Sequence, residues 1–553
     1  MALMGKQKLE DGRQGGDRPL LSLLTLLLVL LPLHSYYALY PLEIESDVRR
    51  GFAQRDGRSA KEFRAFAEFY KLPFEGLEIW VVLASPKKSL GKETIPVGQP
   101  LLDEILRLDA FVQNFTAPFR SGVTTFHDTS SGEDLNALLR YLAQIYPLTA
   151  IMPDVQIQHP VTKVFGHNLQ TSSHFFMVNR GLPENSTLQT AQHVALWYMN
   201  KAENYEETKR LEAIELGLFQ YFLKDDFSDL FSVEMFGDQV ANAEMLRGTI
   251  VSVGLFMLGG ALMVLFMLFM FRHLTWSSRI WMTVGAMLSP LLATLSTFSL
   301  LGWLGVRTNS IMCITPFLVL GIGVDDAFLL LHQWRRVRAE GVLRKDDALK
   351  RVFLHVGPSM AVTSLTNTLA FGIGIMNPAP QMSSFCLGTA LAVLLDFIYE
   401  FAVFAPIMVM CYEERPGGNE KQEPSKWLPS WEGLVNLLFT TSGKCAVIAM
   451  AVLMYLIAGH GLRGMHPTFE PAKTFPGDSE LVHALRSFEY LQTEYWPVNF
   501  VTKRVPGTWE EVAEWEKMVS SLENRDHCYG RSRTTNFLRQ FYEGSFTTWE
   551  LTF

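Results

Sequence analysis

The sequence predicts a polytopic α-helical membrane protein with about seven transmembrane helices and an α/β domain outside the membrane. Mean hydropathy is positive, at +0.13, although 19% of the residues are charged, so the apolar residues must be concentrated. Nearly uncharged runs of roughly 20 residues recur, the length that crosses the hydrocarbon of a bilayer. Basic and neutral loops alternate between these runs, as the positive-inside rule predicts for membrane-spanning helices.

The first apolar run follows a basic segment. We expect residues 1–18 to be cytosolic and 19–40 to form the first transmembrane helix. A cleaved signal peptide is the alternative. The helix is favoured because Tyr36, Tyr37 and Tyr40 close the run like an interfacial aromatic belt, and because no small-residue cleavage site follows.

Residues 41–246 are mixed in polarity and predict an α/β ectodomain. Strand-like runs at 77–85 and 231–240 alternate along the chain with amphipathic helical patterns at 101–115 and 136–146. Such alternation is typical of a domain in which helices cover a sheet.

Six further apolar runs follow this domain, at 248–271, 280–305, 310–331, 356–376, 383–410 and 445–459. We assign 247–411 to a five-helix membrane domain, 412–444 to a charged cytosolic linker and 445–460 to the seventh transmembrane helix. The remaining segment, 461–553, is expected on the same side as the first ectodomain.

Orientation follows from the loops. Arginines and lysines concentrate in the loops after 271 and 334, which are therefore placed in the cytosol. Both ectodomain segments are then extracellular or lumenal, in the plasma membrane or an endomembrane. Two N-glycosylation sequons, at Asn114 and Asn185, fall in the segment placed outside and are predicted glycosylation sites.

An acidic pair interrupts the fourth apolar run, in the stretch GIGVDDAFLLLHQW (321–334). A charged carboxylate at mid-bilayer is costly, so Asp325 and Asp326 are candidates for a site that binds a proton or small cation reversibly. Gly321 and Gly323 lie about one turn before them, where they permit close helix approach. The alternative is that these carboxyls are protonated or hydrogen-bonded packing residues.

Supporting polar groups are expected on the two following helices. Thr363, Thr366 and Asn367 lie in one apolar run, while Asp396 and Glu400 lie four residues apart in the next. A network of these side chains between helices is the hypothesis, and a packing role is the alternative for Asp396 and Glu400.

Enzyme signatures are missing from the sequence. It contains no G-x-x-x-x-G-K-[ST] loop, no H-E-x-x-H and no G-x-S-x-G, and its five cysteines form no C-x-x-C pair. The basic residues form no face suited to nucleic acid. We therefore expect no enzyme activity, no cofactor and no metal site.

Three motifs carry a family resemblance: SDVRRGF (46–52), GIGVDDAFLLLHQW (321–334) and DFIYEFAVFAPIMV (396–409). With the order of helices and ectodomain, they resemble the Patched-related proteins, a eukaryotic branch of the resistance-nodulation-division (RND) transporters. The resemblance implies ferredoxin-like ectodomains, a sterol-sensing domain over the five-helix block, and cation coupling through Asp325 and Asp326. It also implies sterol or another lipid as ligand.

The chain departs from the family pattern in length. It contains one RND-type half, one further helix and the start of a second ectodomain, which suggests a truncated form. A second copy of the chain is then expected to supply the missing half if the chain is active. Lipid transport driven by a proton or sodium gradient is the favoured function. The alternatives are a sterol-sensing regulatory protein or receptor without transport, and an inactive truncated isoform.

Overall fold

The protein is described here from a computed structural model of the full chain. The structure describes most residues between 23 and 539. Outside the description lie 1–22, 46–50, 72–76, 88–92, 127–134, 179–186, 415–430, 467–470, 495–499 and 540–553, with shorter interruptions of one to three residues. The chain divides into two compact units. A membrane unit comprises 1–45 and 249–471, and an α/β unit comprises 46–248 and 472–553.

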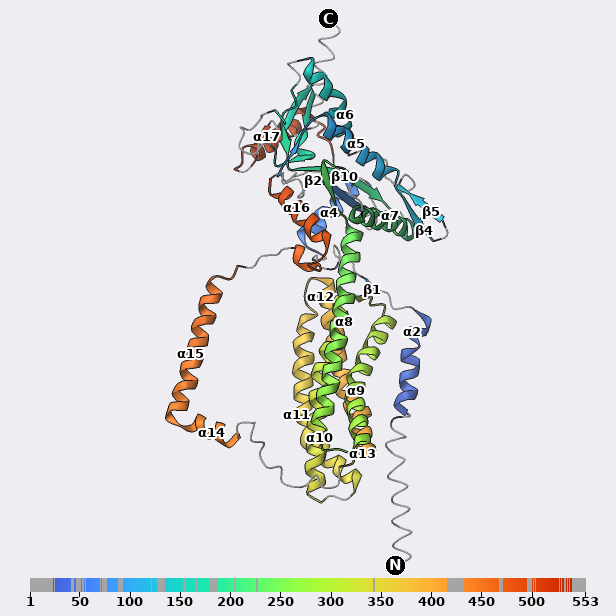
Figure 1. The fold of residues 1–553 in the computed structure, drawn as a ribbon, viewed down its shortest axis with the longest axis vertical. Helices are drawn as coiled ribbons and strands as arrows, with labels where there is room; N and C mark the ends of the chain where they lie inside the picture. The colour runs from blue at the N-terminus through green and yellow to red at the C-terminus, as the bar shows by residue number, and fades with distance from the viewer. Residues whose placement is uncertain are drawn as a thin grey trace, which may run out of the picture. The chain divides into compact units, whose positions relative to one another are not determined.

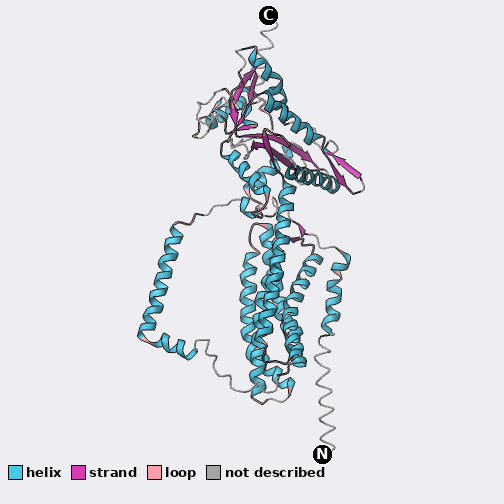
Figure 2. Ribbon diagram, in the orientation of Figure 1, coloured by secondary structure: helices cyan, strands magenta, loops and turns pink. Residues whose placement is uncertain are grey.

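The α/β unit is built on a four-stranded antiparallel sheet in the order β11-β2-β10-β8 (Figures 1 and 2). Its strands are β2 (Leu77–Pro86), β8 (Phe175–Phe176), β10 (His193–Lys201) and β11 (Phe231–Phe236). The central strand β2 is apolar along most of its length because both of its faces are buried. The strand predicted at 77–85 is therefore confirmed.

Helices cover both faces of this sheet. Trp80, Val82 and Ala84 share one face with the apolar stripes of α5 (Gln99–Gln113) and α7 (Tyr205–Lys224). Val81 and Leu83 face the opposite way and pack with Phe488 and Leu491 of α16 (Glu480–Glu494). The segment that follows the last apolar run therefore contributes a helix to the same core as residues 46–248.

The predicted strand at 231–240 is too long. Strand β11 ends at Phe236, and the long helix α8 (Asp238–Met270) begins two residues later. Gly237 makes the turn between them, with the Glu215 carboxyl packed against the space that a side chain would need.

Further elements of the α/β unit are α4 (Arg58–Phe69), α6 (Ala137–Ile145), α17 (Trp509–Glu523) and the strand pairs β3 (Ile95–Pro96) with β9 (Thr190–Ala191), β4 (Thr116–Phe119) with β5 (Gly122–Thr125), and β6 (Val161–Val164) with β7 (His167–Gln170). Short 3₁₀ turns occur at Tyr146–Ala150, Thr171–Ser173 and Pro471–Thr474.

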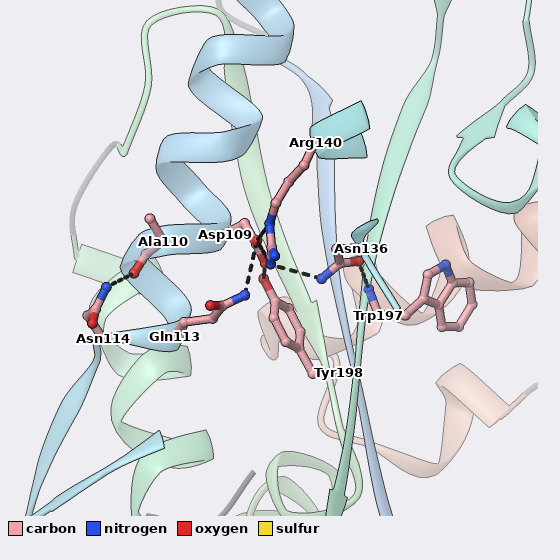
Figure 3. A network of polar contacts seen from close by, with 8 residues as sticks. All are labelled: Asp109, Ala110, Gln113, Asn114, Asn136, Arg140, Trp197 and Tyr198. Carbon is pink, nitrogen blue, oxygen red and sulfur yellow. Dashed lines mark hydrogen bonds and ion pairs between the residues drawn. The ribbon is translucent and has the colours of Figure 1, made fainter. Parts of the chain in front are cut away.

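A buried aspartate ties α5, α6 and β10 together (Figure 3). Asp109 is 3% exposed. Its carboxylate accepts hydrogen bonds from Tyr198 Oη at 2.9 Å, Gln113 Nε2 at 3.0 Å, Asn136 Nδ2 at 3.2 Å and Arg140 Nη2 at 2.8 Å. A buried carboxylate with this many hydrogen-bond donors is satisfied, so we assign Asp109 a structural role rather than a functional one.

The membrane unit is largely helical (Figure 2). Its elements are α2 (Tyr36–Leu39), β1 (Ile44–Glu45), α9 (Trp276–Trp303), β12 (Thr308–Asn309), η5 (Ile311–Ile314), α10 (Thr315–Ala339), α11 (Lys345–Gly374), α12 (Pro380–Tyr399), the π-helix η6 (Glu400–Phe404), α13 (Ala405–Cys411), α14 (Trp431–Phe439) and α15 (Thr441–Arg463), together with the greater part of α8. Strands β1 and β12 form a short parallel pair.

Helices α9 to α12 form the packed bundle of this unit, with η6 and α13 continuing α12 (Figure 1). Trp334, Phe404 and Met408 are among the buried side chains of its core. Helices α8 and α15 instead leave nearly all of their most apolar stretch uncovered, with 6% and 0% of it buried. Uncovered apolar helices of this length suit a lipid environment.

Five helices of the described residues are long and apolar enough to cross a membrane: Asp238–Met270, Trp276–Trp303, Ile311–Ala339, Pro380–Cys411 and Thr441–Arg463. A shorter apolar helix covers Thr25–Leu39. Helix α11 is less apolar because its middle carries threonine, serine and asparagine. The chain is a polytopic membrane protein with a sheet-containing domain.

Candidate functional site

Three buried carboxyl groups lie together inside the helix bundle. Asp326 comes from α10, Asp396 from α12 and Glu400 from the first position of η6, and their exposed fractions are 4%, 2% and 0%. Each is close enough to another to interact with it electrostatically. The structure therefore brings together three of the acidic residues that the sequence singled out.

Gly323 explains how α10 and α12 approach at this point. A β-carbon built on Gly323 would lie 2.9 Å from Asp396 Cγ and 3.0 Å from Oδ1, closer than real side chains pack. No heavy atom lies within 4 Å of the corresponding position at Gly321 in the described structure. The role predicted for the two glycines therefore applies to Gly323, and Gly321 makes no close contact of this kind.

The two aspartates of the motif point in different directions. Adjacent helix positions differ by about 100°, so both cannot face one neighbour. Asp326 is directed into the bundle, whereas Asp325 is exposed. The carboxyl of Asp325 therefore lies on the outer surface of the described bundle.

Serines on α9 complete the polar interior. Ser289 Oγ donates to Asp396 Oδ1 at 3.4 Å, and Tyr399 Oη donates to Ser296 Oγ at 2.9 Å. The two serines are seven residues apart, so they lie on one face of α9. Sequence reasoning missed both, although serines at this spacing in an apolar run were the available signal.

Glu400 has an unusual environment. It begins a π-helical turn, and such turns are often found at functional sites. The Ser289 hydroxyl lies nearby, but within the described residues neither carboxyl oxygen of Glu400 forms a well-aligned hydrogen bond. A buried carboxyl without a partner is more stable when it is neutral, or when a cation or water joins it.

Thr363, Thr366 and Asn367 lie on α11 and are exposed or half-buried. Thr363 Oγ1 donates to Ser359 O at 3.1 Å, and Thr366 Oγ1 donates to Thr363 O at 2.8 Å. Within the described part of the chain, no hydrogen bond joins the three to the buried carboxyls. Their supporting role stays a prediction.

The two predicted glycosylation sites differ in what the structure describes. Asn114 is exposed at the C-terminus of α5, and its Nδ2, the atom that a glycan would modify, donates to Ala110 O at 2.8 Å (Figure 3). Thr116 of the same sequon is also exposed. Asn185 lies outside the described residues. Glycosylation stays a prediction at both.

Carboxyl groups buried together can take up or release protons. A search of the described residues finds no group of three or more His, Cys, Asp or Glu side chains arranged to hold a metal ion. Neighbouring carboxyls in a low-dielectric interior interact strongly, so a change in the charge of one alters the free energy of ionising the others.

Comparison with known proteins finds similarity over part of the chain. Residues 254–410 match the model of the Patched family described as Patched SSD. The chain is 26% identical over 219 residues to NPC intracellular cholesterol transporter 1 homolog 1b of Drosophila melanogaster, covering 37% of this chain and 17% of that protein. It is 31% identical over 137 residues to Patched-related protein 9 of Caenorhabditis elegans, covering 24% and 16%.

A human relative gives a similar result. NPC1-like intracellular cholesterol transporter 1 of Homo sapiens is 29% identical over 126 residues, which are 23% of this chain and 9% of that protein. In each case the chain spans only a minor part of the relative's length. The matched family region, 254–410, contains all three buried carboxyls.

Proposed function

We propose that the chain binds and moves sterol or another lipid, coupled to a proton or sodium gradient, because residues 254–410 match the Patched SSD family model. Coupling runs through Asp325 and Asp326, with Asp396 and Glu400 completing the site. The chain is a transporter component in this proposal and performs no enzymatic reaction.

The observation that carries the proposal is the buried cluster of Asp326, Asp396 and Glu400 in an apolar bundle. A protein that only senses sterol gains nothing from several buried carboxyls, which are costly to place in a membrane. A coupling site requires them, because loading and releasing a cation is an exchange of charge. The names of the relatives, which include cholesterol transporters, support a sterol or similar lipid as the ligand.

The proposal includes a complete topology. Thr25–Leu39 and α11 cross the membrane together with the five longer apolar spans, giving seven transmembrane helices. The α/β unit is then extracellular or lumenal, and its fold is ferredoxin-like. The antiparallel order β11-β2-β10-β8, with α5 and α7 on one face, supports that fold.

The exposure of Asp325 bears on oligomeric state. A coupling carboxylate that faces away from its own bundle needs a partner surface. We propose that a second copy of the chain, or further sequence of RND type, covers Asp325 in the active form.

Gradient-driven flux is the test. The full chain is reconstituted in vesicles with a fluorescent sterol, and transfer is measured with and without an imposed proton or sodium gradient. Asp325→Asn/Asp326→Asn is expected to abolish the gradient-dependent part of the flux. Asp346→Asn/Asp347→Asn is the matched control, because this second adjacent pair is exposed at the first turn of α11.

Equal flux from wild type and the Asp325/Asp326 double variant refutes the coupling role. No flux from folded wild-type protein, with sterol binding retained, favours the alternative function of a sterol-sensing regulatory or receptor protein.

A further inference from the structure

A second polar cluster is buried in the α/β unit. Glu78 on β2 lies directly opposite Asn200 on β10 in the antiparallel register, and Trp80 is two residues further along the same face of β2. Glu78 is 3% exposed, and Asn200 and Trp80 are fully buried. Polar side chains here face the core formed with α7.

Glu215 of α7 joins this cluster at the beginning of α8. Its Oε1 accepts a hydrogen bond from the backbone N–H of Val240 at 2.8 Å, in the first turn of α8. Gln239 Nε2 of the same turn donates to Glu78 Oε1 at 2.8 Å. Both carboxyls are therefore attached to the start of the helix that continues into the membrane unit.

The backbone leaves space for this arrangement. A β-carbon on Gly237 would lie 2.8 Å from Glu215 Cδ and 3.2 Å from Trp80 Cδ1. Glycine at this turn is thus what allows the carboxyl of Glu215 and the indole edge of Trp80 to meet beside α8.

Several polar atoms of the cluster lack partners. Asn200 Nδ2, Asn200 Oδ1, Trp80 Nε1 and Glu215 Oε2 are all buried, and none has a hydrogen-bond partner among the residues that the structure describes. Native interiors rarely leave such atoms unpaired, and an ordered water is the usual partner. Four such atoms in one cluster indicate a ligand.

We propose that Glu78, Trp80, Asn200 and Glu215 enclose a buried site for an ordered water molecule and one exchangeable proton at the first turn of α8. Water fits this set because Asn200 Nδ2 and Trp80 Nε1 are donors, whereas Asn200 Oδ1 and a carboxyl oxygen are acceptors. A metal cation would require acceptors only, and the carboxylate of Glu78 would repel an anion.

Electrostatics indicates where the proton resides. Burial, followed by the charge of Glu78, raises the pKa of Glu215 well above its ordinary value, although hydrogen bonds from the Val240 and Gln239 N–H groups oppose this. The other titratable group facing it is Asp238, in the first turn of α8. Glu215 is therefore the member that holds the proton, and its O–H can donate to the water.

Glu234 provides a matched carboxyl in the same sheet. Burial alone would raise its pKa, but the hydrogen bond and charge of His483 outweigh this effect and lower it. His483 Nδ1 lies 2.8 Å from Glu234 Oε1. Glu215 and Glu234 therefore titrate in different pH ranges, which makes Glu234→Gln a control for Glu215→Gln.

The experiment measures the thermal unfolding midpoint of the full chain in detergent between about pH 5 and about pH 8. A carboxyl whose pKa is raised by folding stabilises the protein at low pH and loses that contribution as pH rises. The midpoint of Glu215→Gln minus that of wild type is therefore expected to increase by at least about 3 °C over this range. Glu234→Gln is the control, because the lowered pKa of Glu234 places its own titration below this range and so contributes no such increase.

A pH-independent difference for Glu215→Gln overturns the proton assignment. If Glu215→Gln does not fold, Glu78→Gln replaces it, because removing the neighbouring charge should weaken the pH dependence of wild type; an unchanged dependence also overturns it. A crystal structure that shows ordered waters tests the other half of the proposal. Density within hydrogen-bond reach of Asn200 and Trp80 Nε1 is expected, and its absence overturns the water site.

Discussion

Gly323→Ala tests the packing of the carboxyl cluster most directly. The new methyl group would lie 2.9 Å from Asp396 Cγ, whereas ordinary contact begins near 3.4 Å, so the carboxyl must move by at least about half an ångström. That movement also disturbs the hydrogen bond from Ser289 to Asp396. Overpacking of this kind typically costs about 1–3 kcal/mol.

Gly321→Ala is the internal control, because no heavy atom lies within 4 Å of its added methyl group in the described structure. Both substitutions gain similar helix propensity by replacing a helical glycine with alanine. The difference between the two variants therefore isolates the overpacking cost. We expect Gly323→Ala to be less stable than Gly321→Ala by about 1–3 kcal/mol.

Thermal unfolding in detergent, with tryptophan fluorescence as the signal, measures this difference. A unit of this size shifts its midpoint by about 2–4 °C for each kcal/mol. Combining Gly323→Ala with Asp396→Ala should recover most of the loss, because the obstructing carboxyl is gone. Equal midpoints for the two glycine variants, or additive effects in the double variant, would refute the reasoning.

Three further outcomes are expected. Asp109→Ala should destabilise the protein by about 3–5 kcal/mol in urea unfolding, because it leaves the Arg140 guanidinium and three other donors without their buried acceptor; a loss below about 1 kcal/mol argues against a structural role. Asn114→Gln should remove one endoglycosidase-sensitive gel shift in a eukaryotic host, and an unchanged shift contradicts the outside placement. Burial lowers the pKa of His174, despite its hydrogen bonds to backbone carbonyls and the charge of Asp109. As pH is lowered below the ordinary histidine pKa, the free energy of unfolding should then fall by up to about 1.4 kcal/mol per pH unit. His174→Gln should flatten that slope.

The sequence was informative where hydropathy and local geometry decide the structure. The length of the apolar runs located the membrane helices. The free-energy cost of placing a charged side chain in the bilayer interior singled out Asp326, Asp396 and Glu400. Helical spacing established that Asp325 and Asp326 diverge. It could not tell which of them faces inward, because that depends on how α10 packs against its neighbours.

Other features depend on contacts that no local pattern encodes. Thr363 and Thr366 were natural candidates for an interhelical network, but a threonine hydroxyl can equally bond a carbonyl of its own helix, as both do here. Ser289 was overlooked because serine is common, and its importance comes from Asp396, more than a hundred residues away. The cluster around Glu215 depends on strand register and on one glycine turn.

The π-helical turn at Glu400–Phe404 makes chain length itself a determinant of the site. Such a turn accommodates one residue more than an α-helix would. Deleting one residue between Asp396 and this turn would rotate Asp396 by about 100° relative to α13. Asp396 would then leave Gly323 and Ser289, although composition and hydropathy were almost unchanged. Deleting one residue inside the turn would instead restore regular winding and leave α12 and α13 nearly in register, because the turn holds the extra residue. In related chains, loss of one residue is therefore expected at this turn rather than between Asp396 and the turn.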